Sequence, residues 1–211
     1  MRGVIISTTA LTLAAAMAAT VVACGPADSS GGAESTVRQP KAPADTPLVA
    51  METSSGRMVI ELYPWLAPAS VQNFLQYVDD GFYDGLVFHR VKPEFVIQAG
   101  GYDLRMLQRQ PREMIRNESD NGLSNVRGTI AMARFSPPHS ASSQFYINVF
   151  DNKPLDHKGV PQGWGYAVFG RVREGLAVVD SISMVTTGVV AGMSDVPLEP
   201  IVIDSARVIE E

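Results

Sequence analysis

Apolar residues between positions 48 and 209 concentrate in short segments of five to nine residues, which is typical of β-strands. Two such runs flank the turn sequence TSSG, so Leu48–Thr53 and Arg57–Tyr63 are predicted to pair as a hairpin. The other predicted strands are Val87–Val91, Phe95–Ala99, Thr129–Arg134, Gln144–Val149, Ala167–Arg173 and Ile201–Ile209. The pattern therefore predicts a mainly β domain.

Two segments have the spacing of an amphipathic helix instead. The first begins near Pro68, which suits a first helical turn, and ends near Gly81. Its apolar residues lie at i, i+3, i+4 and i+7, namely Val71, Phe74, Leu75 and Val78. The second predicted helix is Gly175–Val185. Most of the strands lie between the two helices, so the chain lacks the alternation of a parallel α/β fold.

This order of elements is compatible with two architectures. One is a closed, eight-stranded antiparallel barrel capped by the two α-helices. The other is a two-layer α+β sandwich. The pattern alone does not decide between them, and we expect the barrel.

The first 23 residues have the features of a secretory signal. Arg2 supplies a positive start, and residues 4–23 carry no charge. The run ends in VVAC, which resembles the bacterial lipobox, so Cys24 is expected to be the lipidated first residue of the mature protein. A plain signal peptide with an incidental cysteine and an uncleaved membrane anchor are the alternatives. Cys24 is the only cysteine, so no internal disulfide can form.

Residues 24–47 are rich in Gly, Pro, Ser and Ala and show no apolar period. Such composition is typical of a disordered tether. The folded domain is therefore expected to span residues 48–211 and to be held at the membrane through lipidated Cys24. This predicts a location in the bacterial cell envelope, facing the periplasm or the cell exterior.

Several function classes receive little support. The net charge of −5 does not favour nucleic acid as a partner. The histidines at 89, 139 and 157 lack metal-ligand spacing, so no metal site is expected. The sequence has no G-x-S-x-G motif, so a serine hydrolase has little support. The pair Gly100-Gly101 is weak evidence for a phosphate site and more typical of a turn or bulge.

Polar groups set among apolar residues are the remaining candidates for chemistry. Arg90 and Gln98 lie within FHRVKPEFVIQAGG, and Gln144 lies within SSQFYINV. A shallow apolar pocket with a few hydrogen-bonding groups is the general form of a binding site. Alternatively, Arg90 pairs with a surface acid and the glutamines satisfy backbone groups.

The segment FHRVKPEFVIQAGGYD is similar to the F-H-R-x-x-P-x-F-x-x-Q-x-G signature of the cyclophilins. The later blocks GTIAMAR, SSQFYINV and GYAVFGRV resemble further cyclophilin motifs in the same order, and RNESDNGLSNVRGTIAMAR looks like the bacterial members. The resemblance covers about residues 48–211. It implies an eight-stranded antiparallel barrel with two helices that catalyses cis/trans isomerisation before proline, with no cofactor.

The resemblance also implies a role for each motif residue. Arg90 would be catalytic, Gln98 would position it, and Gln144 would make a second polar contact. Ala133 and the backbone of Arg134 would hold the residue before proline. The positions that match the proline-ring pocket are Phe95, Val96, Tyr146 and Leu155, with Tyr166 where eukaryotic members place a histidine.

Besides Tyr166, three positions depart from the family pattern. Val96 stands where many members have Met, and Tyr146 replaces the usual Phe, which adds a hydroxyl at the pocket floor. Pro154 falls where many members carry the Trp linked to cyclosporin binding, so we expect weak cyclosporin affinity. The expected function is a monomeric isomerase acting on proline-containing polypeptides of the envelope. The alternative is a cyclophilin-fold chaperone or scaffold with little turnover.

Overall fold

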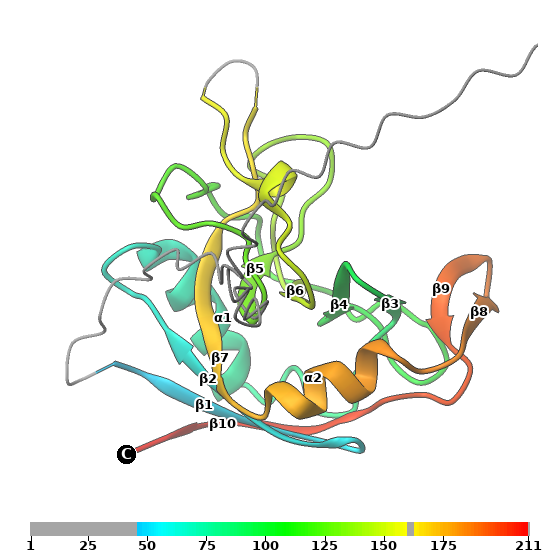
Figure 1. Cartoon of the computed structure of the whole chain (residues 1–211). Coiled ribbons are helices and arrows are strands. Elements are labelled where there is room, and N and C mark those ends of the chain that lie inside the picture. The colour runs from blue at the N-terminus through cyan, green and yellow to red at the C-terminus, as the bar shows by residue number, and fades with distance from the viewer. Residues whose placement is uncertain (1–45, 160–162, 211) are drawn as a thin grey trace, which may run out of the picture. The chain divides into compact units, whose positions relative to one another are not determined.

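The computed structural model describes residues 46–159 and 163–210. The predicted signal segment, Cys24 and nearly all of the predicted tether lie outside these residues. The described chain forms one antiparallel sheet with the strand order β10-β1-β2-β7-β5-β6-β4-β3, and a separate hairpin, β8–β9 (Figure 1). The sheet strands are β1 (Leu48–Thr53), β2 (Gly56–Leu62), β3 (Arg90–Lys92), β4 (Val96–Ala99), β5 (Thr129–Met132), β6 (Phe145–Asn148), β7 (Val168–Glu174) and β10 (Ile203–Ile209). These match the eight predicted strands, so the mainly β prediction is confirmed.

The sheet is an open, curled half-barrel, so the expectation of a closed barrel is wrong. Its edge strands β3 and β10 do not pair with each other as a ladder. The chain just before β3 crosses the gap instead: the Phe88 amide donates to the Ile201 carbonyl (2.9 Å) and the Ile203 amide to the Leu86 carbonyl (2.8 Å). The Gly85 amide also donates to the Ile203 carbonyl (2.8 Å), so the segment before β3, rather than β3 itself, contacts the start of β10.

The side chains of the sheet sort into two clusters by their alternation along each strand. On β6, Phe145 and Ile147 belong to the main core, whereas Tyr146 belongs to a second cluster. On β4, Ile97 joins the main core and Val96 joins the second cluster. The second cluster also includes Tyr63, Leu123, Ala131 and Val168, with Leu66, Phe95, Ala133, Leu155 and Tyr166 packed against it. Alternation therefore supplies two separate apolar surfaces.

Both predicted helices are present, as α1 (Pro68–Asp79) and α2 (Leu176–Ser183), and both bury apolar residues in the main core. The start of α1 has no cap from its own N-cap side chain. The Glu118 carboxylate accepts hydrogen bonds from the backbone amides of Ala69 (3.0 Å) and Ser70 (2.8 Å) instead. A negative charge at a helix N-terminus is stabilising, so this contact secures the long loop between β4 and β5. Neither these helices nor any other in the described residues is long and apolar enough to cross a bilayer.

The hairpin of β8 (Thr187–Val190) and β9 (Met193–Pro197) is an addition that the sequence pattern did not predict. The two strands are joined by Ala191 and Gly192, which have φ of 50° and 81°. Positive φ at both central residues is the geometry of a type I′ turn, which usually carries Asn-Gly or Asp-Gly. β9 packs beside β3, at the right of Figure 1. One further short element, the 3₁₀ helix η1 (Lys153–Leu155), follows β6.

Candidate active site

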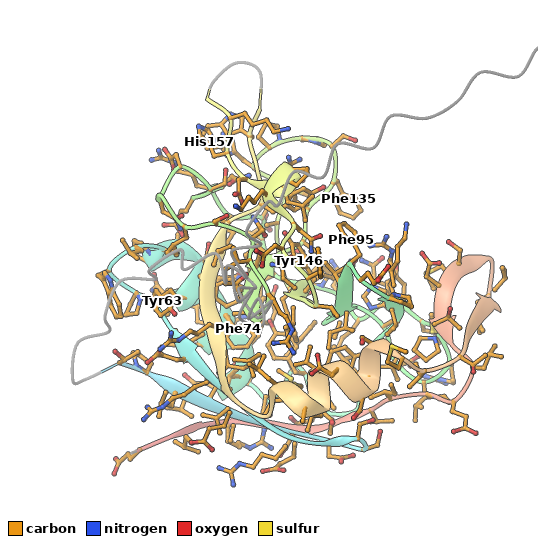
Figure 2. All side chains as sticks on the ribbon, viewed as in Figure 1. Tyr63, Phe74, Phe95, Phe135, Tyr146 and His157 are labelled. Atoms are coloured by element: carbon orange, nitrogen blue, oxygen red, sulfur yellow. The ribbon has the colours of Figure 1, made fainter. Side chains whose placement is uncertain are left out.

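A cavity of about 200 Å³ opens on the face of the sheet that carries the second cluster. Figure 2 shows Phe95 and Tyr146 on this face, with Phe135 nearby. The cavity is lined by Arg90, Phe95, Val96, Gln98, Ala133, Arg134, Tyr146, Leu155 and Tyr166. The tenth predicted residue, Gln144, lines an adjoining cavity of about 90 Å³ that shares Gln98, Ala133 and Arg134. The structure thus brings all ten predicted residues together, while their individual roles stay predictions.

Strand register places the central members of this set. Arg90 on β3 pairs with Gln98 on β4, and Gln98 pairs with Tyr146 on β6. Tyr146 in turn pairs with Ala131 on β5. Directly opposed residues on neighbouring strands have Cβ atoms about 4.5–5.5 Å apart. Residues from four strands therefore form one row across the sheet.

A chain of polar contacts runs along the rim of the cavity. Arg90 Nη1 donates a hydrogen bond to Gln98 Oε1 (3.4 Å), and Gln98 Nε2 donates to Gln144 Oε1 (3.0 Å). The guanidinium carbon of Arg90 lies 5.7 Å from the centre of the Phe95 ring, a cation–π contact. The Arg90 side chain is 34% exposed, so its charge remains accessible to a ligand.

Two glycines make room for Gln144. A Cβ at Gly101 would lie 2.7 Å from Gln144 Nε2, and a Cβ at Gly100 would lie 2.6 Å from the Ser143 carbonyl oxygen. Gly100 also has a φ of 89°, which disfavours any other residue. The pair therefore serves the close approach of β4 and the segment entering β6.

The hydroxyl of Tyr146 is tied beneath the cavity and does not point into it. It donates a hydrogen bond to Asn125 Oδ1 (2.7 Å). Burial raises the pKa of Tyr146 well above its ordinary value, so the hydroxyl stays a donor. Asn125 donates from its backbone amide and its Nδ2 to Asp156 Oδ1 (2.7 and 3.0 Å). Because Asp156 follows Leu155, this buried network sets the position of one wall of the pocket.

The side chain of Arg134 is a second feature that the sequence motifs did not reveal. Its Nε donates to the Gly165 carbonyl (3.1 Å) and its Nη2 to the Trp164 carbonyl (2.6 Å). The guanidinium carbon lies 4.6 Å from the centre of the Tyr166 ring. Arg134 therefore joins the end of β5 to the segment before β7. Trp164 itself packs edge-on against His139 and His157 and does not line the cavity.

His89 is buried beside the catalytic candidate, with its ring 4.7 Å from that of Tyr102. Burial lowers the pKa of His89 from 6.5 to about 4, and the charge of Arg90 acts in the same direction. The imidazole is therefore neutral at physiological pH and adds no positive charge to the site.

Comparisons with known proteins found a matching family model and similar bacterial proteins. Residues 48–208 match the family model described as cyclophilin type peptidyl-prolyl cis-trans isomerase/CLD. Peptidyl-prolyl cis-trans isomerase cyp18 of Streptomyces antibioticus is 53% identical over 162 residues, covering 76% of this chain and 98% of that protein. Peptidyl-prolyl cis-trans isomerase B of Escherichia coli strain K12 is 48% identical over 164 residues, covering 77% and 100%.

A solved structure gives the fold independently. It is the crystal structure of a Cryptosporidium parvum cyclophilin type peptidyl-prolyl cis-trans isomerase in the presence of the dipeptide Ala-Pro. The TM-score is 0.63 at 22% identity, and the match covers 78% of this chain and 99% of that chain. At this identity, the likeness carries the fold alone.

Stability should decline on acidification because of His89. Its pKa is lower in the folded state than in the unfolded state, so the unfolded chain binds the proton more tightly. The stabilisation is complete above the unfolded pKa of 6.5 and is lost as the pH falls, by about 3 kcal/mol at pH 4. Urea denaturation at neutral and acid pH checks the direction. An NMR titration that finds the His89 midpoint near its ordinary value would contradict it.

Tyr146→Phe should lower the free energy of unfolding by about 1–2 kcal/mol, because it removes a buried hydrogen bond to Asn125. The aromatic floor of the pocket is retained. Urea denaturation of the variant and the wild type provides the measurement. An unchanged unfolding midpoint would mean that the hydroxyl contributes nothing to the network.

Proposed function

The chain belongs to the cyclophilin-type peptidyl-prolyl cis-trans isomerase family, and we propose that Arg90 carries its catalysis. Bacterial relatives named as this isomerase are about half identical to it, and the chain is itself a peptidyl-prolyl cis-trans isomerase. The observation that supports the role of Arg90 is its placement: an accessible guanidinium stands at the rim of an apolar cavity and is bonded to Gln98.

The reaction to be accelerated is rotation about a partial double bond. The barrier is about 18–20 kcal/mol because the nitrogen lone pair is delocalised into the carbonyl. Both isomers of a bond before proline exist in unfolded chains, and they exchange in roughly 10–100 s. Lowering this to milliseconds requires about 7 kcal/mol of selective transition-state stabilisation. No bond is made or broken, so the site has to bind the twisted amide better than either planar form.

In this scheme, the apolar cavity binds the proline ring. Phe95, Val96, Tyr146 and Leu155 supply carbon surface, and Val96 and Tyr146 are almost wholly buried. Anchoring the ring leaves the carbonyl on the other side of the bond as the part that turns. Rotation localises the lone pair on the proline nitrogen, and Arg90 donates a hydrogen bond to it. That donor finds no lone pair in the planar ground state, so the contact is selective for the transition state.

The polar groups of the rim orient the peptide. Gln98 and Gln144 are bonded to each other, which leaves further amide N–H and carbonyl groups to meet a peptide backbone. Ala133 and Arg134 line both cavities and so lie along the path of the residues before proline. Arg90 suits its role because a guanidinium is always charged and holds its donors in a rigid plane.

We further propose that the enzyme acts on proline-containing polypeptides in the cell envelope. The support comes from the sequence: the charged start, the apolar run and the VVAC motif before Cys24, followed by a Gly-, Pro- and Ser-rich segment. A lipid on Cys24 with residues 24–47 as a tether would leave the catalytic domain free to meet unfolded chains near the membrane.

Arg90→Ala should lower kcat/KM for a proline-containing peptide by at least about a hundredfold, because it removes the donor to the developing lone pair. The free energy of unfolding should change little, since the side chain is one-third exposed. Arg105→Ala is the matched control, because Arg105 forms an exposed ion pair with Asp103 and does not line the cavity. Near-normal activity of Arg90→Ala would refute the mechanism.

Cys24→Ala should release the protein from the membrane fraction into the soluble envelope fraction, because the variant cannot be lipidated. The wild type should remain bound, since a lipoprotein cysteine carries more than one acyl chain and a single chain anchors only marginally. Fractionation with immunoblotting checks both proteins. A wild type found in the soluble fraction would rule out the lipid anchor.

A further inference from the structure

The unpredicted hairpin brings a carboxylate to the catalytic arginine. β9 packs beside β3, and Asp195 Oδ2 lies 3.6 Å from Arg90 Nε. This distance is that of an ion pair rather than a direct hydrogen bond. The two side chains are 34% and 36% exposed, so the pair stands at the pocket rim and is not buried in the core.

Asp195 and Gln98 hold different edges of the same guanidinium. Gln98 Oε1 accepts from Nη1, and the Asp195 carboxylate faces Nε. An arginine has five N–H donors in one plane. Two contacts at separate edges restrict both the rotation of this plane and its position, while the remaining N–H groups of Nη1 and Nη2 stay available to a substrate.

The backbone conformation of Asp195 suggests that its contact with Arg90 is functional. Its φ is 62°, in the left-handed region that non-glycine residues avoid. Such conformations persist where the surrounding structure maintains them, and they gather at functional sites. Asp and Asn tolerate this region better than most residues. The hairpin therefore holds an acid at a position where glycine would be less strained.

We propose that Asp195 is a positioning residue of the isomerase, which acts by orienting Arg90. This inference rests on the proposed function of Arg90. A partly exposed ion pair contributes little to stability, because water screens it. The orientation of Arg90 affects the rate instead, because the guanidinium must meet a lone pair that exists only in the twisted amide. Misplacement of a catalytic group lowers the rate strongly.

Arg90 was expected either to pair with a surface acid or to be catalytic. The pair with Asp195 is compatible with both roles at once. Asp195 does not neutralise the guanidinium chemically, because arginine keeps its proton at all relevant pH values. Its effect should appear in the turnover step rather than in the binding of the proline ring, which depends on the apolar cavity.

The test is Asp195→Asn, which keeps the tolerated backbone conformation and removes the charge. We expect kcat to fall roughly threefold to tenfold, with KM and the unfolding midpoint unchanged. Asp180→Asn is the matched control: Asp180 pairs with Arg127 at 2.8 Å, away from the cavity, so its rate should equal the wild type. Asp195→Gly, which relieves the left-handed backbone, replaces the Asn variant if that one is unstable.

A double-mutant cycle with Arg90→Lys provides the second readout. Lysine has neither Nε–H nor a planar fork, so Asp195→Asn should have little further effect in that background. A general structural role of Asp195 would instead give independent, additive losses. The proposal is overturned if Asp195→Asn keeps or raises the wild-type kcat, or if the two changes add. Arg90→Ala, assayed in parallel, separates this outcome from failure of the proposed function, since only the latter leaves that variant active.

Discussion

The two-residue period of the β-strand is the constraint on which the whole active face depends. On β4 and β6, one set of side chains fills the main core, and the other set lies in or under the cavity. Alternate residues of the same strand therefore stabilise the core and form the cavity. A slip of one residue in the β4–β6 pairing would exchange the two sets and destroy both surfaces at once. Core packing thereby maintains the register that places Gln98 opposite Tyr146.

Segments outside the sheet complete the pocket, and each is held by polar contacts rather than by apolar packing alone. Asp156 binds Asn125 and through it the floor residue Tyr146, so the wall that carries Leu155 is tied to β6. Arg134 binds the carbonyls before Tyr166 and stacks on its ring. These contacts join loops that are distant in sequence, which explains how the site keeps a defined shape.

Much of this architecture could be predicted from the sequence, because strand and helix periods are local signals. The family resemblance could also select ten residues that the fold brings to two adjoining cavities, and their roles there stay predictions. The open edge of the sheet could not be predicted, because the hydrogen bond between Phe88 and Ile201 depends on how far the sheet curls. The β8–β9 hairpin lacked a recognisable turn, as Ala191 occupies a position that usually carries Asn or Asp. Because the hairpin was not predicted, the contact of Asp195 with Arg90 could not be predicted either. The contact of Asn125 with Asp156 joins two loops, for which the strand and helix periods give no signal.

The pairing of β1 with β10 has a consequence for the folding of the domain. The first and last strands of the domain are neighbours in the sheet, with Leu48 opposite Ile209. Contacts of such large sequence separation form late, because the entropy of closing the whole loop is lost before they form. During synthesis, β1 can pair with β2 early, but it can pair with β10 only after residues 203–209 have left the ribosome. The β1–β10 ladder therefore forms only when the whole domain is available to fold.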